Sequence, residues 1–348
     1  MARLRRSDCS GPGITRRGRG RGFEFLDEDG RRIDDPEVME RIAELAIPPA
    51  WKDVWVCPWP MGHLQATGVD ARGRKQYLYH RKWRERRDQE KFDEMIDFAR
   101  ALPRMRRRVG RDLRDDELTR RRVLACAVRL LDRGFFRVGG EDYAVENESY
   151  GLATIRKSHV TLGDGTIEFD YPAKSGLRRI QSIVDFEVYA IVKQLKTRRG
   201  GSQELLAYRD GRRWVDIKSP DINGYVKEVT GGDFSAKDFR TWNATVLASV
   251  ALAVSGPAAT ASKTARNRAK ARAVKEVAHY LGNTPAVCRA SYIDPRIFDR
   301  FDSGLTIGGA LPALAETGDI AALHGPVEEA VLDLIAEDEG SAAIEKVA

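Results

Sequence analysis

The sequence predicts an α+β protein in two parts: a small β-rich N-terminal domain over residues 21–88, and a larger, mostly helical domain over residues 89–320 that also carries β-hairpins. Two observations predict this fold class. The first part holds short runs of alternating apolar and polar residues between glycine-containing turns, as half-buried strands do. The second part holds long charged segments with helical spacing and repeated helix start and stop signals. Residues 1–20 are expected to form a flexible basic arm and residues 321–348 an acidic C-terminal tail.

Each expected strand of the N-terminal domain has its own apolar run, and a short helix is expected over residues 36–45. In the last strand, Gln76 and Leu78 alternate with Tyr77 and Tyr79, so the two pairs should lie on opposite faces of the sheet. A role in the core of the sheet is the alternative to an exposed position for the two tyrosines. The expected strands cover residues 23–26, 54–57, 64–68 and 73–79.

The larger domain combines helices with two expected hairpins. Residues 84–134 have a helical pattern and a high density of charge. The first hairpin covers residues 158–171 around a Gly-Asp-Gly turn, and Lys174 lies just past its second strand. The second hairpin turns at residues 210–211. From residue 219 onward the pattern is nearly all helix.

The stretch from Gly282 to Tyr292 is the most informative local signal in the chain. Gly282 is expected to end a long basic helix, since glycine adopts a left-handed backbone at low cost. Thr284 and Pro285 then fit the cap and first position of a new helix. This places Asn283 in a tight corner and Tyr292 about two turns further on. A half-buried tyrosine without a chemical role is the alternative for Tyr292 considered alone.

Charge is unevenly distributed along the chain. Lys and Arg number 59 against 52 Asp and Glu, which gives a net charge of +7. Residues 1–23 contain seven arginines and one aspartate, whereas residues 326–348 contain seven acidic residues and one lysine. Further basic segments cover residues 72–91, 100–122 and 263–275. Clustered basic segments favour a protein that binds a polyanion, with solvated helix faces as the alternative. For the acidic segment, a solvated helix is expected, with docking on the rest of the protein or mimicry of DNA charge as the alternatives.

Cysteine and histidine usage predicts neither disulfides nor structural zinc. The four cysteines form no C-x-x-C pair, and the five histidines are scattered. This pattern is typical of a reducing, cytoplasmic compartment. The chain also lacks an apolar run of about 18 residues, the length expected of a membrane-spanning helix.

Five residues in separate motifs form a chemically coherent set. Arg240 lies in a helix that residues 235–238 open with a capping-box pattern. The full set is Arg137, Lys174, Arg240, Asn283 and Tyr292.

These side chains suit the attack of a phenol on a phosphodiester. Guanidinium groups match the non-bridging phosphate oxygens and stay charged, and an amide adds a neutral donor. A lysine at a hairpin end can protonate a leaving sugar oxygen, and a tyrosine can hold the phosphate covalently until the bond is resealed. Such a site requires neither a metal ion nor a nucleotide. We therefore expect no cofactor.

The chain resembles the type IB DNA topoisomerases, in the short bacterial form that is similar to the poxvirus enzyme. Single motifs of this kind are weak signals, but five in the family's order are specific. They span roughly residues 23–300. The motifs are GRKQYLY at 73–79, FRVG at 136–139, the hairpin leading to Lys174, AKDFRTW at 236–242, and GNTP at 282–285 continuing to Tyr292.

The resemblance implies a role for each of the five residues. Arg137 and Arg240 would hold the scissile phosphate, Lys174 would be the general acid toward the 5′ oxygen, and Tyr292 would become joined to the 3′ phosphate. The poxvirus-like pattern has histidine where this chain has Asn283. An amide cannot shuttle protons at neutral pH, so its expected role is limited to hydrogen bonding. The same pattern has a lysine three residues after the first arginine, where this chain has glycine, so the sequence preference is expected to differ.

The resemblance also implies a C-shaped clamp around duplex DNA. The protein would be a cytoplasmic, nucleoid-associated monomer that relaxes positive and negative supercoils by nicking one strand, letting it swivel and resealing it. The N-terminal domain would press on one side of the duplex. The expected DNA contacts are Arg74, Lys75, Gln76, Tyr77, Tyr79 and Tyr143.

Two other functions compete with this one. A tyrosine site-specific recombinase uses a similar Arg/Lys/Tyr set, but typically has a His-x-x-Arg element where this chain has Lys237-Asp238-Phe239-Arg240. A DNA-binding protein without catalytic activity is the other alternative. The presence of all five residues argues against a loss of activity.

Overall fold

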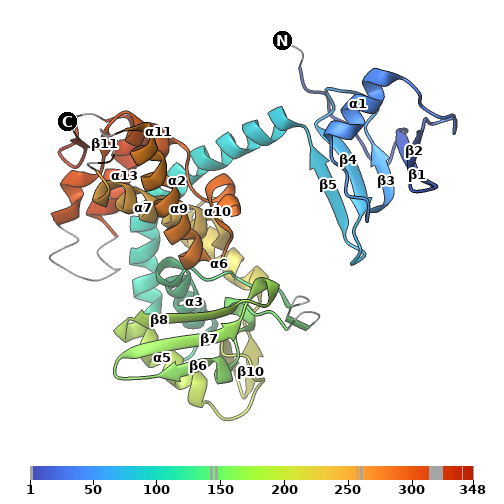
Figure 1. Ribbon diagram of the computed structural model, residues 1–348. Coiled ribbons are helices and arrows are strands. Elements are labelled where there is room, and N and C mark those ends of the chain that lie inside the picture. The colour runs from blue at the N-terminus through green and yellow to red at the C-terminus, as the bar shows by residue number, and fades with distance from the viewer. Residues whose placement is uncertain are drawn as a thin grey trace. The chain divides into compact units, whose positions relative to one another are not determined.

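The computed structural model describes residues 3–141, 144–145, 148–256, 258, 262–312, 324–338 and 340–347. The chain forms two compact units, residues 1–92 and 93–348 (Figure 1). We call these the N-terminal unit and the C-terminal unit. The boundary between them falls inside the long helix α2 (Arg81–Leu113).

The N-terminal unit is an antiparallel sheet of five strands in the order β2-β1-β3-β4-β5, with helix α1 (Pro36–Glu44) packed against it. Asp35 caps α1 by accepting hydrogen bonds from two backbone N–H groups of its first turn. The core joins Ile42 of the helix to Val54 and Val56 of the sheet. The strands are β1 (Ile14–Arg19), β2 (Gly22–Leu26), β3 (Lys52–Val56), β4 (Leu64–Val69) and β5 (Lys75–Tyr79).

The four strands and the helix predicted for this unit are confirmed, but β1 corrects the expectation of a free arm over residues 1–20. Residues 14–19 pair with both β2 and β3, and Ile14 is buried in the core. The strand could not be recognised in the sequence because its three arginines leave Ile14 as the one buried apolar residue: Arg17 and Arg19 are exposed, and Arg16 bonds to main-chain carbonyls of residues 48 and 51. The alternation predicted for β5 is confirmed: Tyr77 and Tyr79 are 44% and 38% exposed, so they do not belong to the core.

The C-terminal unit is mostly helical, and its largest sheet has the order β6-β7-β8. A 3₁₀ turn, Lys174–Gly176, connects β7 to β8. The helices are α3 (Arg120–Gly134), α5 (Phe186–Thr197), α6 (Ser219–Thr230), α7 (Ala236–Val254), α9 (Lys263–Leu281), α10 (Pro285–Ser291), α11 (Arg296–Asp302) and α13 (Pro326–Ala336). The strands are β6 (Val160–Leu162), β7 (Thr166–Pro172), β8 (Arg178–Val184), β9 (Ala207–Asp210), β10 (Arg213–Asp216), β11 (Leu305–Thr306) and β12 (Glu345–Lys346). None of the helices in the described residues is both long and apolar enough to cross a membrane.

Both predicted hairpins are confirmed, whereas β8 was not predicted. Its alternation is inverted: Ile180 and Val184 are exposed, and the inner face carries Arg179 and Gln181 beside the buried Ile183. A pattern with apolar residues outside and polar residues inside does not resemble a half-buried strand. The polar residues point inward because they bond to the ends of neighbouring helices, as described below.

Helix α7 is the central helix of this unit, with buried residues on all sides, and its Trp242 is fully buried. The capping box predicted at its start is confirmed: the N–H of Ser235 donates to the Asp238 carboxylate at 2.7 Å, and the Ser235 hydroxyl accepts from the N–H of Lys237 in the first turn at 3.3 Å. The helix packs against α3, α6, α9, α11 and α13.

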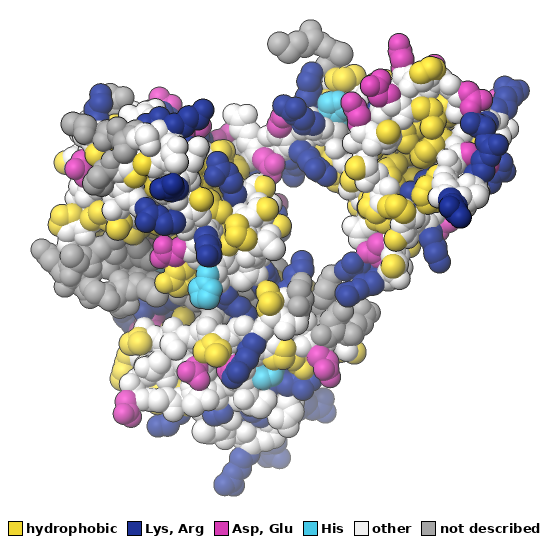
Figure 2. Space-filling view, viewed as in Figure 1, with side chains coloured by type: hydrophobic (Ala, Val, Ile, Leu, Met, Phe, Trp, Pro, Cys, Tyr) yellow, Lys and Arg dark blue, Asp and Glu magenta, His cyan; other side chains and the backbone are white. Residues whose placement is uncertain are grey.

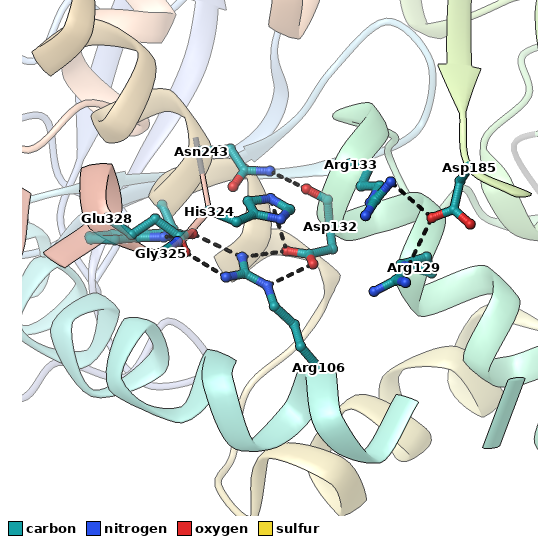
Figure 3. Close-up of polar contacts among 10 residues, drawn as sticks. Arg106, Arg129, Asp132, Arg133, Asp185, Asn243, His324, Gly325 and Glu328 are labelled. Carbon is teal, nitrogen blue, oxygen red and sulfur yellow. Dashed lines mark hydrogen bonds and ion pairs between the residues drawn. The ribbon is translucent and has the colours of Figure 1, made fainter. Parts of the chain in front are cut away.

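A buried polar cluster ties the C-terminal helix α13 to this core (Figure 3). Arg106 of α2 donates to Asp132 of α3 at 2.9 Å and to Glu328 of α13 at 2.9 Å. The indole N–H of Trp242 donates to the same Glu328 carboxylate at 2.8 Å. His324 lies 3.8 Å from Asp132. The solvated helix expected for the acidic segment is therefore wrong for residues 326–336, whose apolar face and one carboxylate are buried.

Replacing Glu328 with glutamine is expected to destabilise this unit by about 3 kcal/mol, because Arg106 then lacks one of its two buried carboxylate partners. Urea denaturation followed by near-UV circular dichroism, to which Trp242 contributes, measures the change. Glu329→Gln is the matched control, since Glu329 is the exposed neighbour on the same helix. Equal stability of the two variants would contradict a structural role for the cluster.

Candidate active site

The site is built around the C-terminal end of α9. The helix ends at Gly282, whose φ of 61° is left-handed, and this confirms the predicted stop. The N–H groups of Gly282 and Asn283 bond back to the carbonyls of His279 and Ala278 at 3.1 and 3.0 Å, which is the Schellman pattern. Thr284 then caps α10, as predicted. Asn283 is therefore held in a corner of fixed backbone geometry.

Three arginines meet at this helix end. The carbonyls of the last turn of a helix lack intrahelical partners and carry partial negative charge, so they attract cations. The carbonyl oxygen of Gly282 accepts from Arg137 at 2.9 Å, that of Leu281 from Arg240 at 2.9 Å, and that of Tyr280 from Arg179 at 2.6 Å.

Arg137 reaches the site because the chain turns sharply after α3. Phe135 ends that helix with a left-handed φ of 54°, and Phe136 is buried edge-on against Phe169 of β7, 4.9 Å between ring centroids. Gly139 continues the turn with a φ of 86°, and a Cβ there would lie only 2.9 Å from Cα of Gly151. This close approach requires glycine. The guanidinium of Arg137 also donates to the side-chain oxygen of Asn283.

Arg240 is almost completely buried and sits beside the tyrosine. It is 4% exposed and donates to the carbonyl oxygens of Phe135 at 2.7 Å and of Leu281 at 2.9 Å. Its Cζ lies 5.2 Å from the centroid of the Tyr292 ring. Burial, together with the positive charge of Arg137, lowers the pKa of Arg240 to about 10.

Tyr292 is anchored through its backbone. It ends α10, with its N–H bonded to the carbonyl of Cys288 at 3.0 Å. Thr245 of α7 donates to the carbonyl of Tyr292 at 3.4 Å and accepts from the N–H of Asp294 at 3.1 Å. The helix that carries Arg240 therefore also fixes the segment that carries the tyrosine.

The environment of Tyr292 lowers the pKa of its phenol. Burial of the ring acts to raise the pKa, but the positive charge of Arg240 and a hydrogen bond from it act in the opposite direction. Arg137 and Lys237 add to the lowering. The net shift is downward, which favours the phenolate that a nucleophile requires.

Two buried donors at this site have no partner among the described residues. They are Nε of Arg240 and Nδ2 of Asn283. Burying a donor without an acceptor is costly, so such groups indicate a site where an acceptor binds. Asn283 accepts from Arg137 through Oδ1, which leaves its NH₂ group as a donor. The local chemistry therefore suits an anion with several oxygens.

The structure brings four of the five predicted residues together and does not place Lys174 in contact with them. Lys174 is exposed in the turn between β7 and β8. Within the described part of the chain, its side chain makes no hydrogen bond or ion pair. The sheet that carries it packs against Phe136, one residue before Arg137, through Phe169 and Tyr171.

Sequence reasoning missed two residues of the site, Arg179 and Lys237. Arg179 follows another arginine in a basic segment, and nothing in the sequence distinguishes it from a surface charge. Lys237 lies one turn before Arg240 on α7, and this helical spacing is a signal that could have found it.

The residues proposed for the N-terminal unit fall into two groups. Arg74 and Gln76 both bond to Asp70, at 2.7 and 2.9 Å, and the bonds from Arg74 lower the pKa of that carboxyl to about 2. Tyr77 and Tyr79 are instead exposed and stacked, 6.2 Å between ring centroids.

Lys75 is also exposed and lies over the Tyr77 ring, with Nζ 5.9 Å from its centroid. Apolar side chains gather over the sheet of this unit (Figure 2). Tyr143 lies outside the described residues. In the described part of the chain, no group of three or more His, Cys, Asp or Glu side chains is arranged to hold a metal ion.

Comparison with known proteins identifies the family. Residues 80–302 match the family model described as eukaryotic DNA topoisomerase I, catalytic core, and residues 22–70 match bacterial DNA topoisomerase IB, N-terminal domain. The chain is 33% identical over 290 residues to DNA topoisomerase 1B of Acanthamoeba polyphaga mimivirus, which covers 81% of this chain and 85% of that protein. It is 29% identical over 159 residues to DNA topoisomerase 1 of Candidozyma auris, which covers 45% of this chain and 20% of that protein. The chain therefore belongs to the type IB DNA topoisomerases and is a DNA-binding enzyme of the isomerase class.

Proposed function

We propose that this protein relaxes positive and negative supercoils by cleaving one strand of duplex DNA through a 3′-phosphotyrosyl bond to Tyr292, without ATP or a metal ion. One observation carries the proposal. Tyr292 lies against a buried arginine at a site where two buried donors, Arg240 Nε and Asn283 Nδ2, have no partner among the described residues. A phosphodiester supplies acceptors for both donors and an electrophile for the phenol.

Cleavage is an exchange of one phosphodiester bond for another. The phenol oxygen of Tyr292 gives its proton to a water molecule and forms a bond to phosphorus, while the bond from phosphorus to the 5′ oxygen breaks. Lys174 gives a proton to the departing oxygen. Resealing is the reverse, with the 5′ hydroxyl as nucleophile and Tyr292 as the leaving group. Because bond energy is conserved in the phosphotyrosine, no other energy source is required.

The arginines and the amide would stabilise the charge that develops on the phosphate. Arg240 is fixed by two main-chain carbonyls, and Arg137 by the carbonyl of Gly282 and the amide oxygen of Asn283. Donors held in this way need no reorganisation in the transition state. Toward the phosphate, Asn283 would act only as a hydrogen-bond donor through its NH₂ group, which suits an amide where the poxvirus-like pattern has histidine.

The N-terminal unit would contact the duplex through exposed residues of β5. Tyr77, Tyr79 and Lys75 are the proposed contacts, and together with the C-terminal unit they would form a clamp around the DNA. Arg74 and Gln76 would reach DNA only by giving up bonds to Asp70. The protein would act as a monomer, and the cleaved strand would swivel under the torsion stored in the DNA.

Neutralising Lys75 is expected to reduce the salt dependence of DNA binding. Each phosphate contact releases counterions, so Lys75→Gln should lower the slope of log affinity against log salt by about 1. Fluorescence anisotropy with a labelled duplex across a salt series measures the slope. Lys346→Gln, an exposed lysine of β12, is the control and should leave the slope unchanged. A wild-type slope in Lys75→Gln would remove Lys75 from the interface.

Relaxation of plasmid DNA tests the function directly. The protein is expected to relax both positively and negatively supercoiled plasmid in EDTA and without ATP. Absence of relaxation with DNA binding intact would overturn the proposal and favour a binding protein without catalytic activity. Relaxation of only one sign of supercoil would contradict the swivelling step.

A further inference from the structure

We propose that Arg179 is a positioning residue that fixes the turn carrying Lys174 against the C-terminal end of α9, which leads through Asn283 to Tyr292. The proposal rests on the proposed function, since it concerns the general acid of the cleavage step. Arg179 lies on β8, five residues after Lys174, and belongs to none of the motifs that led to the other catalytic positions.

The contacts of Arg179 reach across the unit to a single helix end. Its guanidinium donates to the carbonyl oxygens of His279 at 3.1 Å and Tyr280 at 2.6 Å, about a hundred residues further along the chain. Arg137 and Arg240 bind the next two carbonyls of the same turn. Arg179 therefore binds the same partially charged helix end that orients the two proposed phosphate-binding arginines.

The charge of Arg179 acts on the other two guanidinium groups. Burial is the main cause of the lowered pKa of Arg137 and of Arg240, and Arg179 contributes to both shifts. Three like charges gather here because the helix carbonyls offset their repulsion. A substitution at Arg179 therefore leaves in place both arginines that are proposed to contact the phosphate, and their pKa shifts keep burial as their main cause.

Gln181 makes a second connection from the same face of β8. Its amide donates to the carbonyl oxygen of Gly134, at the end of α3, and accepts from the hydroxyl of Tyr171 at 3.1 Å. The inner face of β8 thus contacts the end of α9 through Arg179 and the end of α3 through Gln181. These helix ends lead directly into the segments that carry Asn283 and Arg137.

Among the side chains that the structure describes in the turn holding Lys174, none bonds to another part of the chain. Within the described residues, Lys174 makes no side-chain hydrogen bond or ion pair. Its position relative to the phosphate therefore depends on the strands on either side, and β8 is attached by Arg179. A displacement of about 1 Å in a catalytic group can cost roughly 10²-fold in rate. Loss of Arg179 should accordingly slow proton transfer to the leaving group.

The choice of leaving group separates this role from a general structural one. In a duplex whose bridging 5′ oxygen at the cleavage site is replaced by sulfur, the phosphorus–sulfur bond breaks and a thiolate departs. A thiolate is a far weaker base than an alkoxide, so it leaves without a proton from Lys174. Single-turnover cleavage of the oxygen and sulfur duplexes, by the full-length protein, gives a rate ratio that reports on general-acid catalysis alone.

Arg179→Met removes the guanidinium and keeps an unbranched side chain. We expect it to cleave the oxygen duplex about 10²-fold more slowly than the wild type and the sulfur duplex at close to the wild-type rate. Arg179→Lys keeps one donor for the carbonyls, so its rate on the oxygen duplex should lie between the rates of the wild type and of Arg179→Met. Arg178→Met is the matched control, because Arg178 is the exposed neighbour paired with Asp170 and should show the wild-type ratio.

The outcomes separate failure of this inference from failure of the proposed function. If the wild type forms no covalent adduct on either duplex, the proposed function fails. If the wild type cleaves both and Arg179→Met is slowed equally on both, or is not slowed, Arg179 has no link to the general acid. A thermal melt of each variant shows whether it folds. If Arg179→Met does not fold, the oxygen-to-sulfur rate ratio of Arg179→Lys tests the inference: a wild-type ratio would overturn it.

Discussion

Tyr292→Phe is expected to abolish both plasmid relaxation and the covalent protein–DNA adduct. The substitution removes one oxygen atom and keeps the ring that lies against Arg240. Without that oxygen, no phosphotyrosine can form. Removal of a covalent nucleophile elsewhere costs on the order of 10⁶-fold in rate, which places residual relaxation below detection. Plasmid relaxation and denaturing-gel detection of the adduct measure the two effects.

Tyr280→Phe is the matched control for this substitution. Tyr280 lies one turn before the corner, is 43% exposed, and participates in the site through its main-chain carbonyl, which the substitution leaves in place. It should relax plasmid at the wild-type rate. DNA affinity should be unchanged in both variants. Relaxation by Tyr292→Phe would assign the nucleophile to another residue.

The sequence was most informative where function and local backbone geometry depend on the same residues. Gly282, Thr284 and Pro285 predicted a helix stop and restart, and the structure confirms both. Glycine acts through its own backbone and a capping residue through a side-chain hydrogen bond within the next turn, so both signals can be recognised without knowledge of the tertiary structure. This is why the corner holding Asn283 could be predicted from the chain alone.

Elements whose pattern depends on distant partners could not be predicted in this way. The strand β8 has polar residues on its inner face because Arg179 and Gln181 bond to helix ends contributed by other parts of the chain. The buried Glu328 of α13 resembled a solvated charge because its partner, Arg106, lies 222 residues earlier. In both cases the residue types are explained by contacts that no local window contains.

The convergence of three arginines on the end of α9 could not be predicted from the sequence either. Motif spacing identified Arg137 and Arg240 as a pair, but not the α9 carbonyls that hold them. Those carbonyls fix the guanidinium groups before any phosphate binds. The end of α9 therefore determines the geometry of the proposed phosphate site, whereas the sequence motifs identify only which residues form it.

Substitutions of Arg240 are expected to have the second largest effect, because this residue binds phosphate and lowers the pKa of the nucleophile in the proposed mechanism. Arg240→Gln should slow single-turnover cleavage by roughly 10³-fold, within the range seen when a single transition-state donor or arginine is removed. The pKa of Tyr292 should rise, since the positive charge that lowers it most is gone. The rise of cleavage rate with pH should therefore move to higher pH.

Arg240→Lys separates the charge from the geometry of the guanidinium group. A lysine keeps a positive charge near Tyr292 but lacks the guanidinium fork that donates to Phe135 and Leu281 and still has a buried Nε without a partner among the described residues. We expect a large loss of rate with a pH profile close to that of the wild type. Rates measured from pH 6 to 10 on one duplex distinguish the two variants. A wild-type pH profile in Arg240→Gln would show that Arg240 does not control the ionisation of Tyr292, whereas a wild-type rate in Arg240→Lys would show that charge alone is sufficient at this position.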